Sequence, residues 1–562
     1  MNIIQQIDFA EAARNIFLYN QSAPLIFTRF FFWAFFAIVL LGYTLVYKNK
    51  NRTVRAGYLF VVSLFFYYKS SGFFFFILLL SVLVGYLTGK GIYKSRNEIV
   101  KQVLIAVSVF FNLLVLAYFK YSYFFVDSIN VLFGTDLHVL NHLAVWANES
   151  VGTHFQVNQI LLPVGISFFT FQTISYTVDV YRKETVPVKN IIDFAFYVSF
   201  FPQLVAGPIV RASGFVKQIY EDYSLSKSEF GWAIFMILKG LVKKIFIGDY
   251  IAVNFVDRVF SDPITYSGFE NLMALFGYSL QVYVDFSGYT DIAIGVALLM
   301  GFRLPQNFNS PYKAKNVGEF WKRWHMSLSS WLKDYLYIPI GGNRNGSVFS
   351  YLSLFVILAI VLILIGNLIL VPVTAVMVLV FFLFMRYSPG FKRGVDNNIN
   401  LMLTMLLGGL WHGASLNFII WGGLNGVGLV IYKFWRKISP WEKRNFWLVK
   451  IWKIALTFTF ITFTRLFFRS ESMEIAKTMF KQITTSFTLT IIPEVLVGYK
   501  WVFLMMLFGF VIHWLSSNWK KKIEDWFIAT PLWLKVIISA IIIIVVYQSI
   551  SADMQAFIYF QF

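Results

Sequence analysis

Long apolar blocks, separated by short basic clusters, are the feature that most constrains this chain. Residues 27–47, 269–302 and 349–386 are examples, and similar blocks recur almost to the end of the sequence. A helix that crosses a bilayer needs about 20 predominantly apolar residues. Counting the blocks against this length predicts an all-α polytopic integral membrane protein with about 11 to 14 crossings. We expect one membrane-embedded domain over residues 1–562.

The composition agrees with a chain that lies mostly in lipid. It is 58% hydrophobic, 20% aromatic and only 14% charged, whereas soluble domains carry about 25% charged residues. The net charge of +20 comes from Lys and Arg in short runs between apolar blocks. That distribution follows the positive-inside rule, so we expect a bilayer partner and no nucleic acid.

The charged loops also predict which side of the membrane each connection faces. Residues 48–55 and 313–344 are rich in Lys and Arg and should be cytoplasmic. Residues 127–159 contain three carboxylates and neither Lys nor Arg, so they should lie on the opposite side. Residues 191–210 are apolar but hold Pro202, Gly207 and Pro208. Such broken segments are tolerated at membrane depth where they are buried in protein or line a cavity.

His412 lies in LLGGLWHGAS (407–416), which otherwise resembles membrane-embedded sequence. An ionisable side chain at bilayer depth is costly and usually marks a functional site. Small neighbours allow close approach of a backbone or a ligand, and a neutral imidazole can accept a proton from a hydroxyl. A histidine that only bonds a neighbouring helix fits equally well, so local features leave both interpretations open.

His325 lies in residues 317–342, where Phe320, Trp324, Leu328, Trp331 and Tyr335 recur with helical spacing. This pattern predicts an amphipathic helix at the membrane interface, and alone it favours an incidental histidine. His138 and His142 are four residues apart, but a third ligand is lacking, so we expect a loop surface and no metal site. His513 precedes Trp514 near the end of an apolar block and is expected at the interface.

The remaining polar candidates are Asp285, Asp291, Asn307 and Asn309. Carboxylates within a bilayer-length segment should face a cavity or a partner. A transport path would use them as readily as an active site would. The chain has no cysteine, which excludes disulfides, thiolate metal sites and a cysteine nucleophile.

The ordered set of motifs resembles the membrane-bound O-acyltransferase family, in particular its alginate O-acetylase-type branch of polysaccharide O-acetylation. The resemblance covers much of residues 160–476. The matching stretches are LLPVGISFFTFQTISYTVDVYR (161–182), FPQLVAGPIVR (201–211), YSLQVYVDFSGYTDIAIGVALLMGFRLPQNFNSPY (278–312), FWKRWHMSLSSWLKDYLYIPIGGNR (320–344), LMLTMLLGGLWHGASLNFIIWGGLNG (401–426) and FTRLFFRSESMEIA (463–476).

The resemblance implies that His412, in the WHG motif, is catalytic, and that His325 is a second functional residue. It implies a funnel or tunnel through the cytoplasmic membrane, built from transmembrane, amphipathic and re-entrant helices. An acyl thioester such as acetyl-CoA would enter from the cytoplasm, with no permanently bound cofactor. Its acyl group would go to hydroxyls of an extracytoplasmic polysaccharide, often with a separate extracytoplasmic transferase or esterase-like partner.

With these roles, His412 would act as the general base. The candidates for lining the tunnel or supporting the site are Asp285, Asp291, Asn307, Asn309, Trp324 and Trp411.

One segment departs from the family pattern. Residues 348–399 carry an apolar hairpin where the family usually has a short basic linker, so they are predicted to be an insertion. Two rival functions remain: D-alanyl transfer to teichoic acid, and transport, such as a flippase for a lipid-linked sugar. The two histidines in their full motifs favour the acyltransferase.

Overall fold

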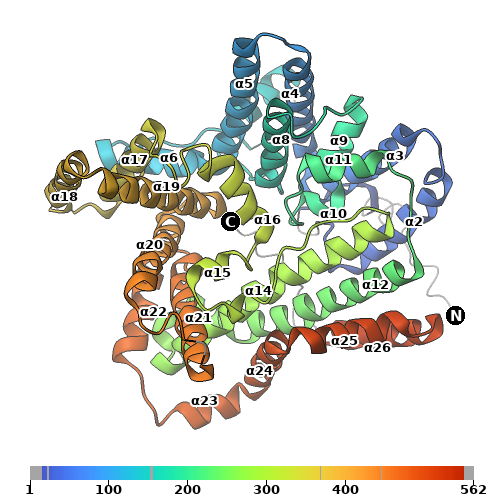
Figure 1. The fold of residues 1–562 in the computed structure, drawn as a ribbon. Helices are drawn as coiled ribbons and strands as arrows, with labels where there is room; N and C mark the ends of the chain where they lie inside the picture. The colour runs from blue at the N-terminus through green and yellow to red at the C-terminus, as the bar shows by residue number, and fades with distance from the viewer. Residues whose placement is uncertain (1–15, 22–23, 152–155, 368, 445, 550–562) are drawn as a thin grey trace.

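The computed structural model describes residues 16–21, 24–151, 156–367, 369–444 and 446–549 (Figure 1). Within these ranges the regular structure is helical and no strand occurs, which confirms the predicted all-α class. The N-terminal helices are α2 Phe30–Val46, α3 Arg52–Ser71, α4 Phe75–Lys94, α5 Glu98–Leu116, α6 Ser122–Phe133 and α7 His142–Val151.

The middle of the chain alternates short and long helices. They are α8 Ile166–Tyr181, α9 Ile191–Ser199, α10 Phe201–Leu204, α11 Ala212–Tyr220, α12 Lys227–Leu241, α13 Asp257–Ser261, α14 Gly268–Leu299, α15 Val317–Trp321 and α16 Met326–Leu332. Seven short 3₁₀ or π segments connect or extend helices of the described chain: η2 Gly72–Phe74, η3 Ala117–Tyr121, η4 Val242–Asp249, η5 Ala252–Val256, η6 Pro263–Thr265, η7 Pro311–Lys313 and η8 Lys333–Tyr337.

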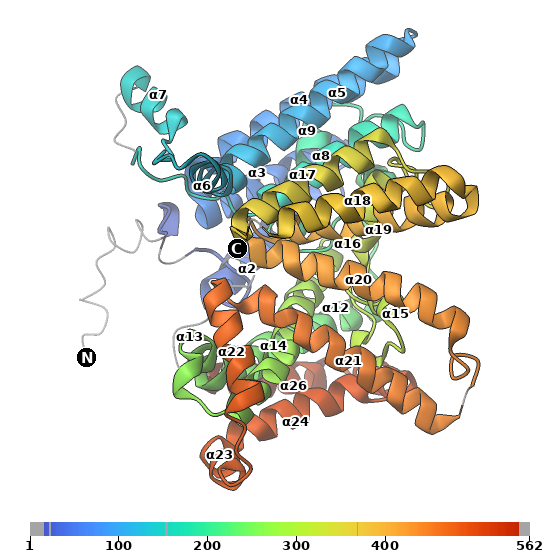
Figure 2. The same cartoon turned by 90° about the vertical axis from the view of Figure 1, so that its left-hand side faces the viewer.

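The C-terminal part wraps around this middle region (Figures 1 and 2). Its helices are α17 Val348–Ile365, α18 Leu370–Tyr387, α19 Pro389–His412, α20 Leu416–Ile438, α21 Trp447–Arg469, α22 Met473–Thr485, α23 Ile492–Gly498, α24 Lys500–Trp514, α25 Ser517–Ala529 and α26 Leu532–Gln548.

Five helical stretches of the described residues are long and apolar enough to cross a membrane, or six if the bent pair α23–α24 is one span. They are Arg52–Lys94, Glu98–Phe133, Gly268–Leu299, Leu416–Ile438 and Trp447–Arg469. This count is lower than the 11 to 14 crossings that were expected from the apolar blocks of the sequence. The reason is that α2, α17, α18 and α26 offer only shorter apolar segments, and the apolar region after residue 160 is divided among α8 to α11.

Helix α14 is the buried centre of the fold. A capping box between Ser267 and Glu270 starts it, and its apolar window is wholly buried among α12, η4, α21, α22 and α24. Gly288 permits close contact with α12, because a Cβ there would lie 2.8 Å from the carbonyl oxygen of Gly240.

Helices α17 and α18 form an apolar pair beside α19 (Figure 2). The chain turns between them at Gly366, whose φ of +68° is a conformation that glycine adopts readily. Many large apolar side chains of α18 are exposed, Val376 and Leu379 among them. Residues 348–387 therefore form a helical hairpin. Its status as an insertion stays a prediction.

Candidate functional site

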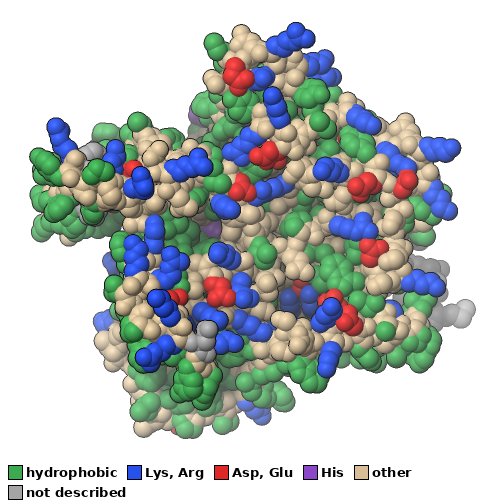
Figure 3. Space-filling model, in the orientation of Figure 1, with side chains coloured by type: hydrophobic (Ala, Val, Ile, Leu, Met, Phe, Trp, Pro, Cys, Tyr) green, Lys and Arg blue, Asp and Glu red, His purple; other side chains and the backbone are tan. Residues whose placement is uncertain are grey.

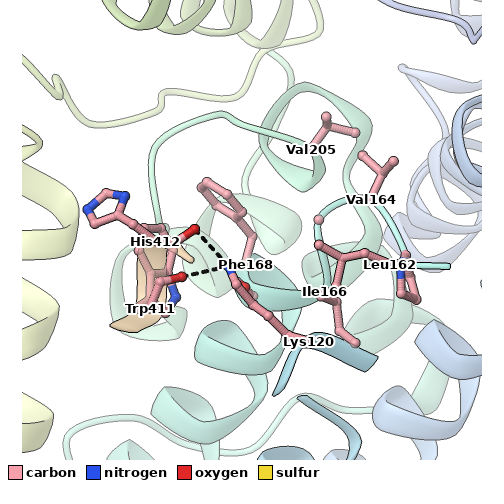
Figure 4. Close-up of a pocket in the computed structure, with 11 residues that line it drawn as sticks. Lys120, Leu162, Val164, Ile166, Phe168, Val205, Trp411 and His412 are labelled. Carbon is pink, nitrogen blue, oxygen red and sulfur yellow. Dashed lines mark hydrogen bonds between the residues drawn. The ribbon is translucent and has the colours of Figure 1, made fainter. Parts of the chain in front are cut away.

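Helix α19 carries His412 as its last residue. The chain leaves the helix at Gly413, which is extended with φ −165°. The last carbonyls of a helix have no partner within it and need outside donors. Lys120 Nζ donates to the carbonyl oxygens of Trp411 (2.7 Å) and His412 (3.1 Å), and Tyr121 Oη donates to that of Leu410 (2.7 Å) (Figure 4). Two side chains from a distant helix thus hold the end of α19 in place.

Lys120 and Tyr121 lie in the π-helical segment η3, between α5 and α6. A π-bulge inserts one residue into a helix, re-aims the side chains that follow, and is frequent at functional sites. A cation at a helix C-terminus also complements the negative end of the helix dipole. The π-helical segment η3 therefore carries the two side chains that cap the end of α19.

The glycines of the His412 motif have separate purposes. A Cβ on Gly409 would lie 2.3 Å from the carbonyl oxygen of Phe418, so this glycine allows α19 to cross α20 closely. A Cβ on Gly413 would lie 2.0 Å from the ring of Phe418. At Gly408 the nearest atom would be Leu332 Cδ1 at 3.2 Å, and this glycine borders a cavity.

The His412 imidazole lies in an aromatic enclosure and is only 3% exposed. Its ring centroid is 4.9 Å from that of Trp411, 5.1 Å from Trp421 and 5.2 Å from Phe468. Aromatic walls exclude water and make a neutral imidazole the favoured form. Figure 4 shows the imidazole directed away from Lys120 and Val164, while the His412 carbonyl faces Lys120.

His325 is fully buried and adopts a left-handed conformation with φ +43°. It is the N-cap residue of α16 but makes no side-chain cap bond to that helix, and Asn307 supplies the capping acceptors instead. The Asn307 carbonyl oxygen accepts from the Met326 N–H (2.9 Å), and its Oδ1 accepts from the Ser327 N–H (3.1 Å) and Oγ (2.9 Å). A non-glycine residue at positive φ is sparsely populated and persists where its surroundings fix it. Asn307 is therefore a positioning residue for His325.

This finding corrects the helix expected over residues 317–342. The structure divides the segment into α15, a turn at residues 322–325, α16 and η8. Phe320, Trp324 and Leu328 are 2–4% exposed, so the aromatic face packs inside the protein and does not lie at the membrane interface. The helical spacing is real, but the cap from Asn307 starts a new helix at Met326.

The fold brings the two histidines of the sequence motifs together. Their ring centroids are 6.4 Å apart, and Trp411 lies beside both, with its centroid 5.8 Å from that of His325. The His325 ring also meets the Phe286 ring of α14 edge-on at 4.6 Å. Both imidazoles therefore belong to one buried site.

His412 lines two cavities of different size. The larger has about 650 Å³ and lies between α15, α16, α19 and α20. Near His412 its wall includes Leu328, Met405 and Trp421. Four cations also line it, namely Lys322, Lys333, Lys433 and Arg436. On the face drawn in Figure 3, Lys and Arg side chains gather over α15 and α20.

The smaller cavity has about 70 Å³. Residues 162–168, Val205, Lys120 and Trp411 line it together with His412 (Figure 4). Residues 162–168 closely follow the segment 127–159, which the charge pattern places on the extracytoplasmic side.

The predicted carboxylates have ion-pair partners. Asp285 pairs with Lys244 at 2.5 Å, and Asp291 pairs with Lys243 at 2.7 Å and with Lys239 at 3.3 Å. Neither carboxylate is among the described residues that line the two cavities at His412. Buried charges need such partners, so the pairs account for both carboxylates through the packing of α14 on α12 and η4.

The other predicted residues fall in three places. Trp411 lines the small cavity. Trp324 is buried against the Arg465 guanidinium, 4.5 Å from its ring centroid. Asn309 is exposed and borders a third cavity, described below. His513, expected at the interface, is only 2% exposed, because Tyr283 of α14 and Tyr312 of η7 pack against it.

Two cations, Lys120 and Arg465, are not among the site residues expected from the sequence. Arg465 is 4% exposed and donates to the carbonyl oxygen of Ser279 at 3.0 Å. Both lie inside long apolar helices that could span a membrane. An ionisable residue in such a segment is by default a candidate functional residue, and that signal would have found them.

Comparison with known proteins gives a consistent result. The family model for the membrane-bound O-acyltransferase family matches residues 139–392. The chain is 38% identical over 378 residues to a protein of Pseudomonas syringae pv. tomato described as a probable alginate O-acetylase, covering 66% of this chain and 59% of that protein. It is 31% identical over 481 residues to the peptidoglycan O-acetyltransferase of Helicobacter pylori, covering 81% of this chain and 78% of that protein.

A third relative is the teichoic acid D-alanyltransferase of Bacillus subtilis, 30% identical over 55% of this chain and 69% of that protein. The chain belongs to the membrane-bound O-acyltransferase family. It is a multi-pass membrane protein. The chain spans about three fifths of the length of the alginate relatives.

Proposed function

We propose that this protein is a membrane O-acyltransferase that moves an acetyl group from a cytoplasmic thioester, acetyl-CoA, to hydroxyls of an extracytoplasmic polysaccharide. The observation that carries the proposal is that His412 lines both cavities. The large cavity has a cationic wall in a region predicted to be cytoplasmic. The small one adjoins residues that follow the predicted extracytoplasmic segment.

The large cavity suits the donor. A thioester of coenzyme A combines phosphates, which Lys and Arg bind as ion pairs, with a narrow apolar arm. The four cations would hold the phosphates, and the wall of Leu328, Met405 and Gly408 would hold the arm. The thioester carbonyl would then approach His412.

The small cavity suits the acceptor, which has to bring only one hydroxyl to the site. His412 would take the hydroxyl proton as the oxygen attacks the thioester carbonyl carbon. The C–S bond then breaks, and the departing sulfur takes up the proton. Transfer through an acyl-histidine intermediate has the same overall balance and stays an alternative. His325 would hydrogen-bond the donor or orient His412.

General-base catalysis contributes about 10²- to 10⁴-fold, and the remainder must come from positioning and from stabilising the oxyanion. We assign the positioning to the caps described above: Lys120 and Tyr121 hold the end of α19, and Asn307 holds His325.

The polysaccharide branch is favoured over D-alanyl transfer because its relatives match more of this chain, 66% and 81% against 55%. Transport is disfavoured, since the ion pairs of Asp285 and Asp291 explain the carboxylates that suggested it. We place the protein in the cytoplasmic membrane, where an extracytoplasmic transferase or esterase-like partner would complete the modification.

The test uses membranes that contain the full chain, the acceptor polymer and its partner proteins, supplied with acetyl-CoA labelled in the acetyl group. We expect label on the polymer with the native chain, and a loss of at least about 100-fold with His412→Ala. His138→Ala is the control, because His138 is an exposed histidine far outside the site. Undiminished transfer by an equally abundant His412→Ala chain would contradict the role of His412. Absence of acetyl transfer by the native chain, with transfer from a D-alanyl carrier instead, would favour the second function.

A further inference from the structure

A third cavity, of about 670 Å³, is not used by the proposed acyl transfer. It lies between α12, α14, α24, α25 and α26, which run side by side in the lower part of Figure 1. Neither His325 nor His412 lines it. Its walls combine buried polar atoms, lysines and apolar side chains in three adjoining zones.

The first zone is a buried polar wall. Three of the residues that line it carry a buried side-chain atom with no hydrogen-bond partner among the described residues: Thr290 Oγ1, Asn307 Nδ2 and His513 Nδ1. Buried polar atoms in proteins nearly always have a partner, so three at one cavity need an explanation.

Two of these atoms are fixed as donors. Asn307 Oδ1 accepts from the Ser327 backbone N–H, which leaves the Nδ2 amino group to donate. His513 Nε2 accepts from the Tyr312 N–H at 3.2 Å, so the neutral ring carries its proton on Nδ1. The wall therefore calls for an acceptor with several oxygens.

The second zone is cationic. Four lysines (Lys239, Lys243, Lys520 and Lys521) face two carboxylates, Asp291 and Glu524. Asp291 is shared by Lys239 and Lys243. Lys520 instead donates to Ser310 Oγ at 2.9 Å and to the His513 carbonyl at 2.7 Å. Burial and the neighbouring lysines lower the pKa of Lys520 to about 8, a sign of positive charge that an anion would relieve.

The third zone is apolar and is supplied mainly by α12, α25 and α26. Its residues include Phe235, Ile523, Trp526, Phe527, Ile538 and Ile542. Trp526 is 58% exposed, so the apolar zone of the cavity is open to the outside of the helix bundle, where the lipid of the membrane lies. Residues 520–522, in the first half of α25, form a basic cluster between apolar blocks, so we expect the start of α25 on the cytoplasmic side.

We propose that this cavity binds the phosphate headgroup of an anionic phospholipid from the cytoplasmic leaflet, with an acyl chain along α26. The phosphate oxygens accept from the polar wall and pair with Lys520 and Lys521, while the chain covers the apolar zone. Basic pockets between transmembrane helices on the cytoplasmic side recognise such headgroups. Asn307 joins this cavity to the His325 turn, so an occupied cavity would also brace that turn.

The test measures binding, so its outcome does not depend on acyl transfer. The full chain is purified in detergent and titrated with phosphatidylglycerol or with phosphatidylcholine of the same acyl chains, and the rise in unfolding temperature is recorded. We expect phosphatidylglycerol to act at concentrations at least about tenfold lower. Equal effects of the two lipids would overturn the proposal.

Two variants locate the binding. The double change Lys520→Gln and Lys521→Gln should weaken phosphatidylglycerol binding at least about tenfold, whereas Lys477→Gln with Lys481→Gln, two exposed lysines of α22, should not. Thr290→Val removes one unpartnered hydroxyl and keeps the shape of the side chain. It should leave the lipid-free unfolding temperature unchanged or higher and still weaken lipid binding. An equal loss in the α22 control, or full binding by Thr290→Val, would contradict the site.

A last experiment distinguishes a lipid phosphate from a soluble phosphate compound as the ligand of this cavity. Inorganic phosphate or coenzyme A, each added at millimolar concentration, should not displace phosphatidylglycerol. Displacement by either would assign the cavity to a soluble phosphate compound and overturn the lipid assignment.

Discussion

The two cavities that meet at His412 differ in size and in charge. The large one has about 650 Å³ and four cations in its walls, whereas the small one has about 70 Å³ and a single lysine, which is engaged with backbone carbonyls. A cavity of the first kind can hold a large anionic donor, and the second can admit little more than one hydroxyl group. The difference indicates that the site accepts two unlike substrates from two directions.

Among changes that leave both histidines in place, the largest effect is expected from Lys120→Met, at the small cavity. This change leaves the carbonyls of Trp411 and His412 without their donor, and a buried unsatisfied carbonyl costs about 1–3 kcal/mol. We expect acetyl transfer to fall about 10- to 100-fold, as measured with labelled acetyl-CoA in membranes. Lys90→Met, at an exposed lysine of α4, is the control. Full activity of Lys120→Met would show that acetyl transfer does not depend on this cap.

An intermediate effect is expected from the paired glycines of α19. Gly408→Ala projects a methyl group into the large cavity, and we expect kcat/KM for acetyl-CoA to fall about tenfold while the amount of folded protein is kept. Gly409→Ala places its Cβ against the Phe418 carbonyl, so it should destabilise the protein by about 1–3 kcal/mol. Thermal unfolding measures the loss of stability, and titration with acetyl-CoA measures the loss of kcat/KM. A loss of stability in Gly408→Ala, with a loss of kcat/KM only in Gly409→Ala, would show that Gly408 does not face the donor.

The smallest effect is expected from single cations of the large cavity. Arg436→Gln should raise KM for acetyl-CoA about two- to fivefold, because one partly exposed ion pair contributes about 0.2–1 kcal/mol. With acetyl-pantetheine, which lacks the nucleotide phosphates, KM should not change. The adjacent exposed Lys437→Gln should leave both values unchanged. Equal effects on both donors would contradict phosphate binding at this position.

The fold class was predictable from the sequence, because the length of an apolar block is a local feature. Local features left the role of His412 open, and its catalytic role stays a prediction that rests on the family motifs. The cap on α19 was not predictable in the same way, since Lys120 lies 291 residues before Trp411 in the chain. The aromatic spacing of residues 317–342 predicted one interfacial helix. It gave no indication that Asn307 would start a second helix and hold His325 at positive φ.

His513 shows the same limit. Trp514 beside it suggested an interfacial residue, but His513 is buried by Tyr283 of α14 and Tyr312 of η7. Contacts of this kind depend on packing between distant helices, which periodicity along one segment does not report.

The most direct test of the central claim is the accessibility of the two cavities from the two sides of the membrane. The chain has no cysteine, so single substitutions give an unambiguous label. Ser329→Cys places a thiol in the large cavity and Ser167→Cys places one in the small cavity. Each is treated with a small, charged, membrane-impermeant thiol reagent in sealed vesicles of known orientation. We predict that Cys at 329 reacts only from the cytoplasmic side and is protected by acetyl-CoA, and that Cys at 167 reacts only from the opposite side. Reaction of both thiols from one side would contradict a site that His412 joins to two faces of the membrane.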